Sequence, residues 1–214
     1  MQPEDIFVAG SSGSCIEISM QAFRVKRGQR VFTTKGLASM GYGLPSTIGA
    51  ALASDRKKTV CVNGDGGFQM NIQELQTIYR LNLPIKIFVL CNQGYAAIYG
   101  TQSNLFEGNL VACNEESNLS LPDIVQVAKA YKLRTIVIHD NNEVHDKVKE
   151  VLEGEEPVIC QVDVTINLKI LPKQISYKRA DGQMESLPLE YLNPMIDEHE
   201  FRENMLIPLC QENR

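Results

Sequence analysis

Short apolar runs alternate along most of this chain with segments in which apolar residues recur at helical spacing. The apolar runs predict strands over residues 6–8, 59–62, 85–90, 135–138 and 157–164. The periodic segments predict helices over residues 16–23, 46–53, 68–79, 122–131 and 142–152. Strands that alternate with helices are typical of an α/β fold: a doubly wound, mostly parallel sheet with helices on both faces.

Two regions break this rhythm. Residues 95–120 are polar and have few periodic apolar positions, which predicts a long functional loop. From Ile166 onward, scattered prolines and mixed charge predict an extended C-terminal tail with one short helix near residues 197–205. We therefore expect one ligand-binding domain over residues 1–165 and the tail over residues 166–214.

Composition excludes several classes of function. Of 214 residues, 43% are hydrophobic and 22% are charged, as in an ordinary globular protein. The net charge of −5 argues against nucleic-acid binding, and no apolar run approaches the roughly 20 residues of a membrane span. The six cysteines have no C-x-x-C spacing, and several lie in apolar runs. We expect reduced thiols, a cytoplasmic location and no zinc site.

Two polar residues follow two of the predicted strands directly. Asp65 lies in Asn-Gly-Asp-Gly-Gly after the strand at 59–62, and Asn92 follows the strand at 85–90. One helix and one strand separate them, which is the length of a right-handed crossover that returns to the same sheet edge. Each could be a simple turn residue when considered alone. Together, a carboxylate and an amide oxygen suit Mg²⁺ held beside a phosphorylated cofactor, and glycines allow the main chain to approach phosphates closely.

At these residues the chain resembles the thiamine diphosphate-dependent enzymes, within them the acetolactate synthase-like group. Their signature is Gly-Asp-Gly, a stretch of this length, and then Asn-Asn or a close variant. The resemblance also covers residues 36–45, 70–75 and 82–86, and it extends from about residue 6 to residue 164. It implies a thiamine diphosphate-binding fold and a C-terminal, pyrophosphate-type domain of an enzyme that acts on 2-oxo acids.

The resemblance also implies a set of site residues. Asp65, the Asn92 side chain and the Gly94 carbonyl would bind Mg²⁺. Met40 would lie beneath the cofactor and bend it, and the Ala38 carbonyl would accept a hydrogen bond from its exocyclic amine. The remaining residues expected to border the cofactor are Gly13, Ser14, Cys15, Gly64, Gly66, Gly67 and Tyr95.

The chain departs from the family pattern in four places. Cys91 replaces the first Asn of the pair, Gly67 a frequent Ser and Ala38 a frequent Gly, all at positions that are not side-chain metal ligands. The fourth departure is larger: no segment matches the pyrimidine-binding domain, whose glutamate activates the cofactor. We therefore expect a transferase or lyase that is inactive alone and is completed by a pyrimidine-binding domain or subunit, within a homo-oligomer.

Other interpretations remain open at this level. The chain could be the separate subunit of a two-component 2-oxo acid decarboxylase, or a non-catalytic domain that retains cofactor binding. A flavodoxin-like nucleotide or flavin binder would explain the alternation of strands and helices. That last interpretation leaves the Asp65 and Asn92 pair without a use, so it ranks below the others.

Overall fold

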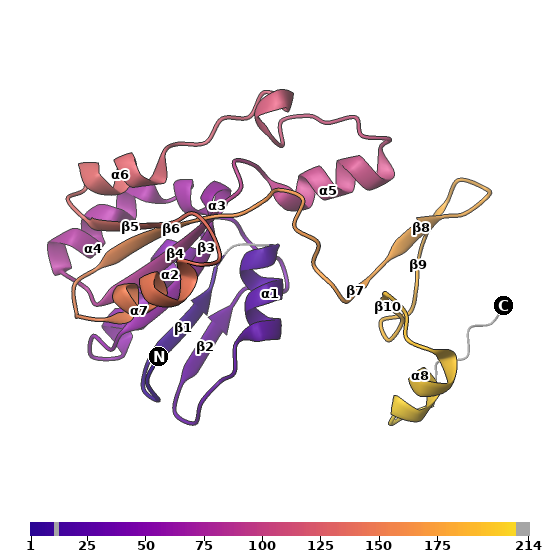
Figure 1. The fold of residues 1–214 in the computed structure, drawn as a ribbon, viewed down its shortest axis with the longest axis horizontal. Helices are drawn as coiled ribbons and strands as arrows, with labels where there is room; N and C mark the ends of the chain where they lie inside the picture. Colours follow the sequence, from indigo (N-terminus) through magenta and orange to yellow (C-terminus); the bar gives the residue numbers. More distant parts are fainter. Residues whose placement is uncertain (11–12, 209–214) are drawn as a thin grey trace. The chain divides into compact units, whose positions relative to one another are not determined.

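The fold is built on one six-stranded sheet in which every pair of strands is parallel (Figure 1). It is seen in a computed structural model that describes residues 1–10 and 13–208. The strand order is β2-β1-β3-β4-β6-β5. The strands are β1 (Ile6–Ala9), β2 (Arg30–Thr33), β3 (Thr59–Gly64), β4 (Ile85–Cys91), β5 (Arg134–Ile138) and β6 (Val158–Asp163).

Helices cover both faces of this sheet, as the strand–helix alternation predicts. Residues of α2, α3, α4 and α6 join one buried apolar cluster, and residues of α1 and α7 join a second. The predicted doubly wound fold is therefore confirmed. The helices are α1 (Ser14–Ala22), α2 (Gly43–Ala53), α3 (Asp65–Gln69), α4 (Leu75–Leu81), α5 (Ala96–Leu105), α6 (Ile124–Ala130) and α7 (Val144–Leu152).

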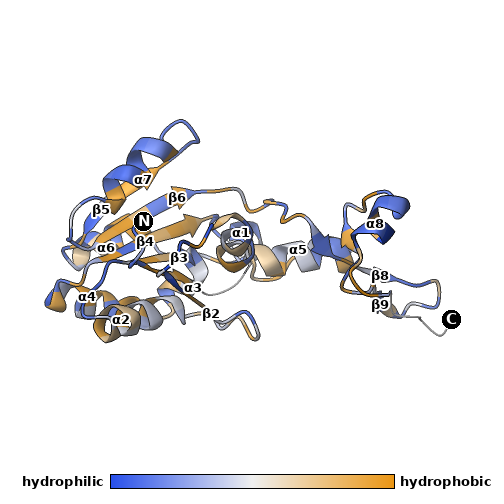
Figure 2. Ribbon diagram, turned by 90° about the horizontal axis from the view of Figure 1, so that it is seen from below, coloured by the Kyte–Doolittle hydropathy of each residue, from blue (hydrophilic) through white to orange (hydrophobic). Residues whose placement is uncertain are grey.

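The central strands are apolar because both of their faces are buried. In β4, Ile87 belongs to the first cluster and its neighbour Phe88 to the second. Figure 2 shows these strands in the hydrophobic colour, whereas the outer helix α7 is largely hydrophilic. Because β1, β3 and β4 pair in parallel, the turns that follow them lie at the same edge of the sheet.

Three elements differ from the sequence-based expectations. The helix predicted over residues 68–79 is divided into α3, a 3-10 helix (Ile72–Glu74) and α4. The predicted loop at residues 95–120 begins with the helix α5, whose ten residues include none that is buried. A helix without a buried face has no apolar periodicity, so the pattern could not reveal it. The edge strand β2 was also missed, because it is short and only partly buried. No helix in residues 1–10 and 13–208 is long and apolar enough to cross a bilayer.

The chain from Lys169 onward forms a second compact unit. Its helix α8 (Glu198–Asn204) lies within the region where the sequence predicts one. The unit also contains two small antiparallel sheets, which the sequence did not predict; each has two strands of two or three residues. These strands are β7 (Lys173–Gln174), β8 (Ser176–Lys178), β9 (Met184–Ser186) and β10 (Leu192–Asn193).

Candidate cofactor site

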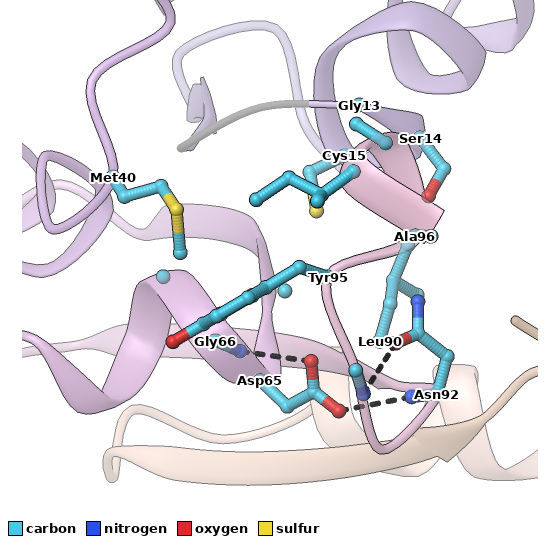
Figure 3. Close-up of a pocket in the computed structure, with 15 residues that line it drawn as sticks. Gly13, Ser14, Cys15, Met40, Asp65, Gly66, Leu90, Asn92, Tyr95 and Ala96 are labelled. Carbon is cyan, nitrogen blue, oxygen red and sulfur yellow. Dashed lines mark hydrogen bonds between the residues drawn. The ribbon is translucent and has the colours of Figure 1, made fainter. Parts of the chain in front are cut away.

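The candidate site lies at the carboxyl ends of three neighbouring strands, β1, β3 and β4. The chain leaves β1 to build the sheet in one direction and returns at β3 to build it in the other, so β1 and β3 flank a topological switch point. Ligands of open α/β sheets bind at the carboxyl edge beside such a point. The turns after β1, β3 and β4 all line one pocket here (Figure 3).

Asp65 joins the turn after β3 to the turn after β4. Its Oδ2 accepts hydrogen bonds from the backbone N–H groups of Asn92 (3.0 Å) and Gln93 (2.8 Å). Its Oδ1 accepts one from the N–H of Gly66 at 2.8 Å. The residue is only 2% exposed. The structure therefore brings the two turns side by side, as the crossover length predicts.

Asn92 shapes the second turn. Its side-chain Oδ1 accepts a hydrogen bond from the N–H of Gly94 at 3.0 Å, which leaves this oxygen a further lone pair. Gly94 is packed so closely that an added Cβ would lie 2.5 Å from the Cys113 carbonyl oxygen and 2.7 Å from Ile166 Cδ1. Within residues 1–10 and 13–208, no group of three or more His, Cys, Asp or Glu residues is arranged to hold a metal. Any metal held here would therefore need amide or main-chain oxygens beside Asp65.

Three helices begin at the pocket, and in none of them does the side chain of the N-cap residue accept a hydrogen bond from the first turn. These helices are α1 after Gly13, α3 after Gly64 and α5 after Tyr95. The first N–H groups of a helix have no acceptor inside the helix, and the helix dipole adds partial positive charge there. The pocket therefore presents several uncapped backbone donors to one small volume. This arrangement suits an anion with several oxygens, such as a diphosphate.

Gly66 forms the floor of the pocket beneath two side chains. An added Cβ on Gly66 would overlap Tyr95 Cε1 and would lie 2.7 Å from Tyr95 Cδ1 and 3.3 Å from Met40 Cε. Figure 3 shows the Tyr95 ring between Met40 and Asp65. The Tyr95 hydroxyl accepts a hydrogen bond from Gln69 Nε2 at 3.3 Å. With the ring in this position the remaining cavity is about 80 Å³.

Burial shifts the titration of two groups in the pocket. It raises the pKa of Asp65, and the hydrogen bonds from Gly66, Gln93 and Asn92 oppose part of that shift by stabilising the carboxylate. A buried carboxylate with a raised pKa is a favourable ligand for a divalent cation, because the cation removes the cost of burying its charge. Burial, with the neighbouring Cys61 and Asp65, raises the pKa of the Cys15 thiol to about 12, so this thiol stays neutral.

The pocket contains every site residue expected from the sequence except Ala38. Ala38 has a positive φ of 52° and packs beside the second apolar cluster, outside the pocket lining. Four lining residues were not expected: Leu90, Ala96, Ala97 and Ile98. The last three form the first turn of α5 and were hidden by the expectation of a loop. Gly94, two residues before the start of α5, was the one sequence feature that could have indicated a helix start here.

A family model described as "Thiamine pyrophosphate enzyme, C-terminal TPP binding domain" matches residues 11–162. The chain belongs to this family. The match covers the whole sheet apart from the first strand and the end of the last, and it includes all three turns of the pocket. The expected family and the thiamine diphosphate-binding fold are thus confirmed.

Curated relatives of this thiamine pyrophosphate-binding domain are acetolactate synthases. The chain is 33% identical over 156 residues to acetolactate synthase 2, chloroplastic, of Zea mays, covering 71% of the chain and 24% of that protein. It is 34% identical over 152 residues to the probable acetolactate synthase large subunit of Methanococcus aeolicus, covering 70% and 25%. Isozyme 1 large subunit of Escherichia coli K12 is 30% identical over 152 residues, covering 71% and 26%. The chain spans about a quarter of the length of these relatives.

Proposed function

We propose that this domain holds the diphosphate of thiamine diphosphate, through Mg²⁺, within an acetolactate synthase-like enzyme that acts on 2-oxo acids. The observation that carries the proposal is the junction at Asp65. One buried carboxylate ties two glycine-containing turns together beside three uncapped helix starts. The Asp65 carboxylate lies beside backbone donors that suit an anion, and two anions at one place would repel each other. A divalent cation bound to both would remove that repulsion.

The residues present fit this cofactor. Asp65, the Asn92 side chain and the Gly94 carbonyl would bind the metal, which prefers oxygen ligands. The backbone N–H groups of Gly66 and Gly67 would donate to phosphate oxygens, with those of Ser14 and Cys15 beside them. The Gly66 N–H would exchange the Asp65 oxygen that it now binds for a phosphate oxygen. A side chain at Gly66 would fill the space that such an approach requires.

When bound, thiamine diphosphate supplies a nucleophilic carbon and an electron sink for the bond breaking of a 2-oxo acid. The chain's own residues contribute positioning and exclusion of water. Met40 contacts the floor of the pocket at Gly66 and would support the bent cofactor, and the Ala38 carbonyl would orient its exocyclic amine. The half-buried Tyr95 and the first turn of α5 close one side of the pocket.

We further propose that the domain is inactive alone. The titratable groups that line the pocket are Asp65, Cys15 and Tyr95, and none is a carboxylic acid placed to activate a cofactor ring, since Asp65 is engaged by three backbone N–H groups. A pyrimidine-binding domain, on this protein or on a partner within a homo-oligomer, would supply that acid. The overall reaction would be a carboligation or a decarboxylation, in a reducing cytoplasmic setting that suits the free thiols of the described cysteines.

The test is a titration of the ¹⁵N-labelled chain with thiamine diphosphate and Mg²⁺, followed by backbone amide shifts. We expect shifts at Gly66, Gly67 and residues 96–98, and none without Mg²⁺. Asp65→Ala removes the metal ligand and is expected to abolish the shifts. Asp146→Ala is the matched control, because the Asp146 side chain is 91% exposed on α7 and does not line the pocket.

Three results would contradict the proposal. The first is an unchanged spectrum for the wild type throughout the millimolar range of cofactor. The second is equal binding by Asp65→Ala. The third concerns activity: release of CO₂ from a 2-oxo acid by the chain alone, above the rate of free cofactor, would show that no second domain is needed.

A further inference from the structure

Tyr95 stands in the space where a cofactor would meet the floor of the pocket. Its ring atoms Cδ1 and Cε1 lie against Gly66, on the same side as the Met40 methyl group. The cavity that remains is about 80 Å³, whereas pockets that hold cofactor-sized ligands measure roughly 300 to 1,000 Å³. The ring in this position therefore takes up the space beside Gly66 on the side where a Cβ would lie.

The backbone of Tyr95 is held in place, whereas its side chain makes a single long hydrogen bond. The Tyr95 N–H donates to the Cys113 carbonyl at 2.8 Å, and the Tyr95 carbonyl accepts from the Tyr99 N–H at 2.9 Å, so the start of α5 is fixed. The side chain itself has one polar contact in the structure, the 3.3 Å hydrogen bond from Gln69 Nε2. Rotation about the side-chain torsions thus moves the ring away from Gly66 without disturbing the helix start.

We propose that Tyr95 is the residue that controls entry of the diphosphate: its ring occupies the space beside Gly66 and must rotate out before the cofactor binds. This inference rests on the proposed function. When only a fraction of the chains is in the binding-competent state, the apparent dissociation constant equals the intrinsic constant divided by that fraction. The closed ring therefore weakens cofactor binding, and Gln69 acts as its latch.

The experiment measures the dissociation constant of thiamine diphosphate with Mg²⁺ by the amide titration described above, on variants of the same 214-residue chain. Tyr95→Ala removes the ring and is expected to bind about tenfold more tightly than the wild type. Tyr95→Phe and Gln69→Leu remove only the latch, and each is expected to bind about threefold more tightly. Tyr79→Ala is the matched control, because Tyr79 is 41% exposed on α4 and does not line the pocket.

The sign of the change decides between entry control and direct contact. If Tyr95→Ala binds as tightly as the wild type or less tightly, the ring does not compete with the cofactor and the inference is wrong, while the proposed function stands. Binding by the wild type, with tighter binding by all three variants, would support the inference. If neither the wild type nor any variant binds, the proposed function fails as well. If Tyr95→Ala does not fold, Tyr95→Phe and Gln69→Leu serve in its place, and the same comparison of their dissociation constants with that of the wild type decides.

Discussion

Asp65→Ala is expected to loosen the sheet edge even when no metal or cofactor is present. The substitution removes the acceptor of three backbone N–H groups. Loss of an acceptor costs about 1 kcal/mol for the buried Gly66 and about as much for the half-buried Asn92, whereas water can hydrate the exposed Gln93. Removal of a carboxylate whose pKa is raised by burial offsets part of this cost. We expect a net loss of about 1 to 2 kcal/mol.

Native-state hydrogen exchange of the amides in β3 and β4 measures this change. It reports the sheet alone, whereas a single unfolding curve would mix the two compact units of the chain. The expected loss corresponds to exchange about 5 to 30 times faster in the variant. Asp65→Asn retains one oxygen and should show a smaller effect, and Asp146→Ala should show none. Exchange in Asp65→Ala within a factor of two of the wild type would refute the role of Asp65 as a tie between the turns.

Three further predictions follow from the same contacts. Gly94→Ala places a Cβ 2.5 Å from the Cys113 carbonyl oxygen, so we expect a stability loss of about 1 to 3 kcal/mol and weaker Mg²⁺ binding by calorimetry. The control is Gly100→Ala, which has open space at its position in α5 and should leave stability unchanged or increase it. Protons compete with Mg²⁺ for the Asp65 carboxylate, and burial raises the pKa of this group. The Mg²⁺ affinity measured by calorimetry should therefore be retained above that pKa and lost as the pH falls through it. The loss should occur at a higher pH than for an exposed aspartate. The Cys15 thiol, with its pKa raised to about 12, should resist alkylation at pH 8 until the chain is unfolded, as measured by mass spectrometry of the labelled peptide.

The central part of the fold was predictable because its signals are local. Strands such as β4 are apolar runs that end at glycine-containing turns, and helices such as α4 repeat apolar residues at helical spacing. The order of the strands was not predictable in the same way. β6 lies between β4 and β5, and this choice depends on packing between segments more than 60 residues apart in sequence. Short edge elements such as β2 also gave no sufficient pattern.

The candidate site was predictable to the extent that it depends on side chains and glycines. Asp65, Asn92 and Gly94 were visible in the sequence, and the structure places all three at one pocket. The first turn of α5 was not visible, because its contribution is made by backbone N–H groups whose residue types carry no signal. The position of the Tyr95 ring could not be predicted either, since a side-chain torsion is decided by contacts with Gly66 and Gln69 in the folded chain.

Because the proposed site is built mainly from the backbone, we expect it to tolerate the departures from the family pattern. Cys91 and Gly67 replace more common residues, yet each of these positions contributes through the main chain or through packing, so the replacement leaves the donors where they were. The same logic makes Gly66 and Gly94 intolerant, because a Cβ at either position would meet atoms closer than 3.0 Å. The chemistry of this domain is therefore set less by which side chains are present than by where side chains are absent. Asp65 is the exception, because its carboxylate ties together the turns on which the backbone donors depend.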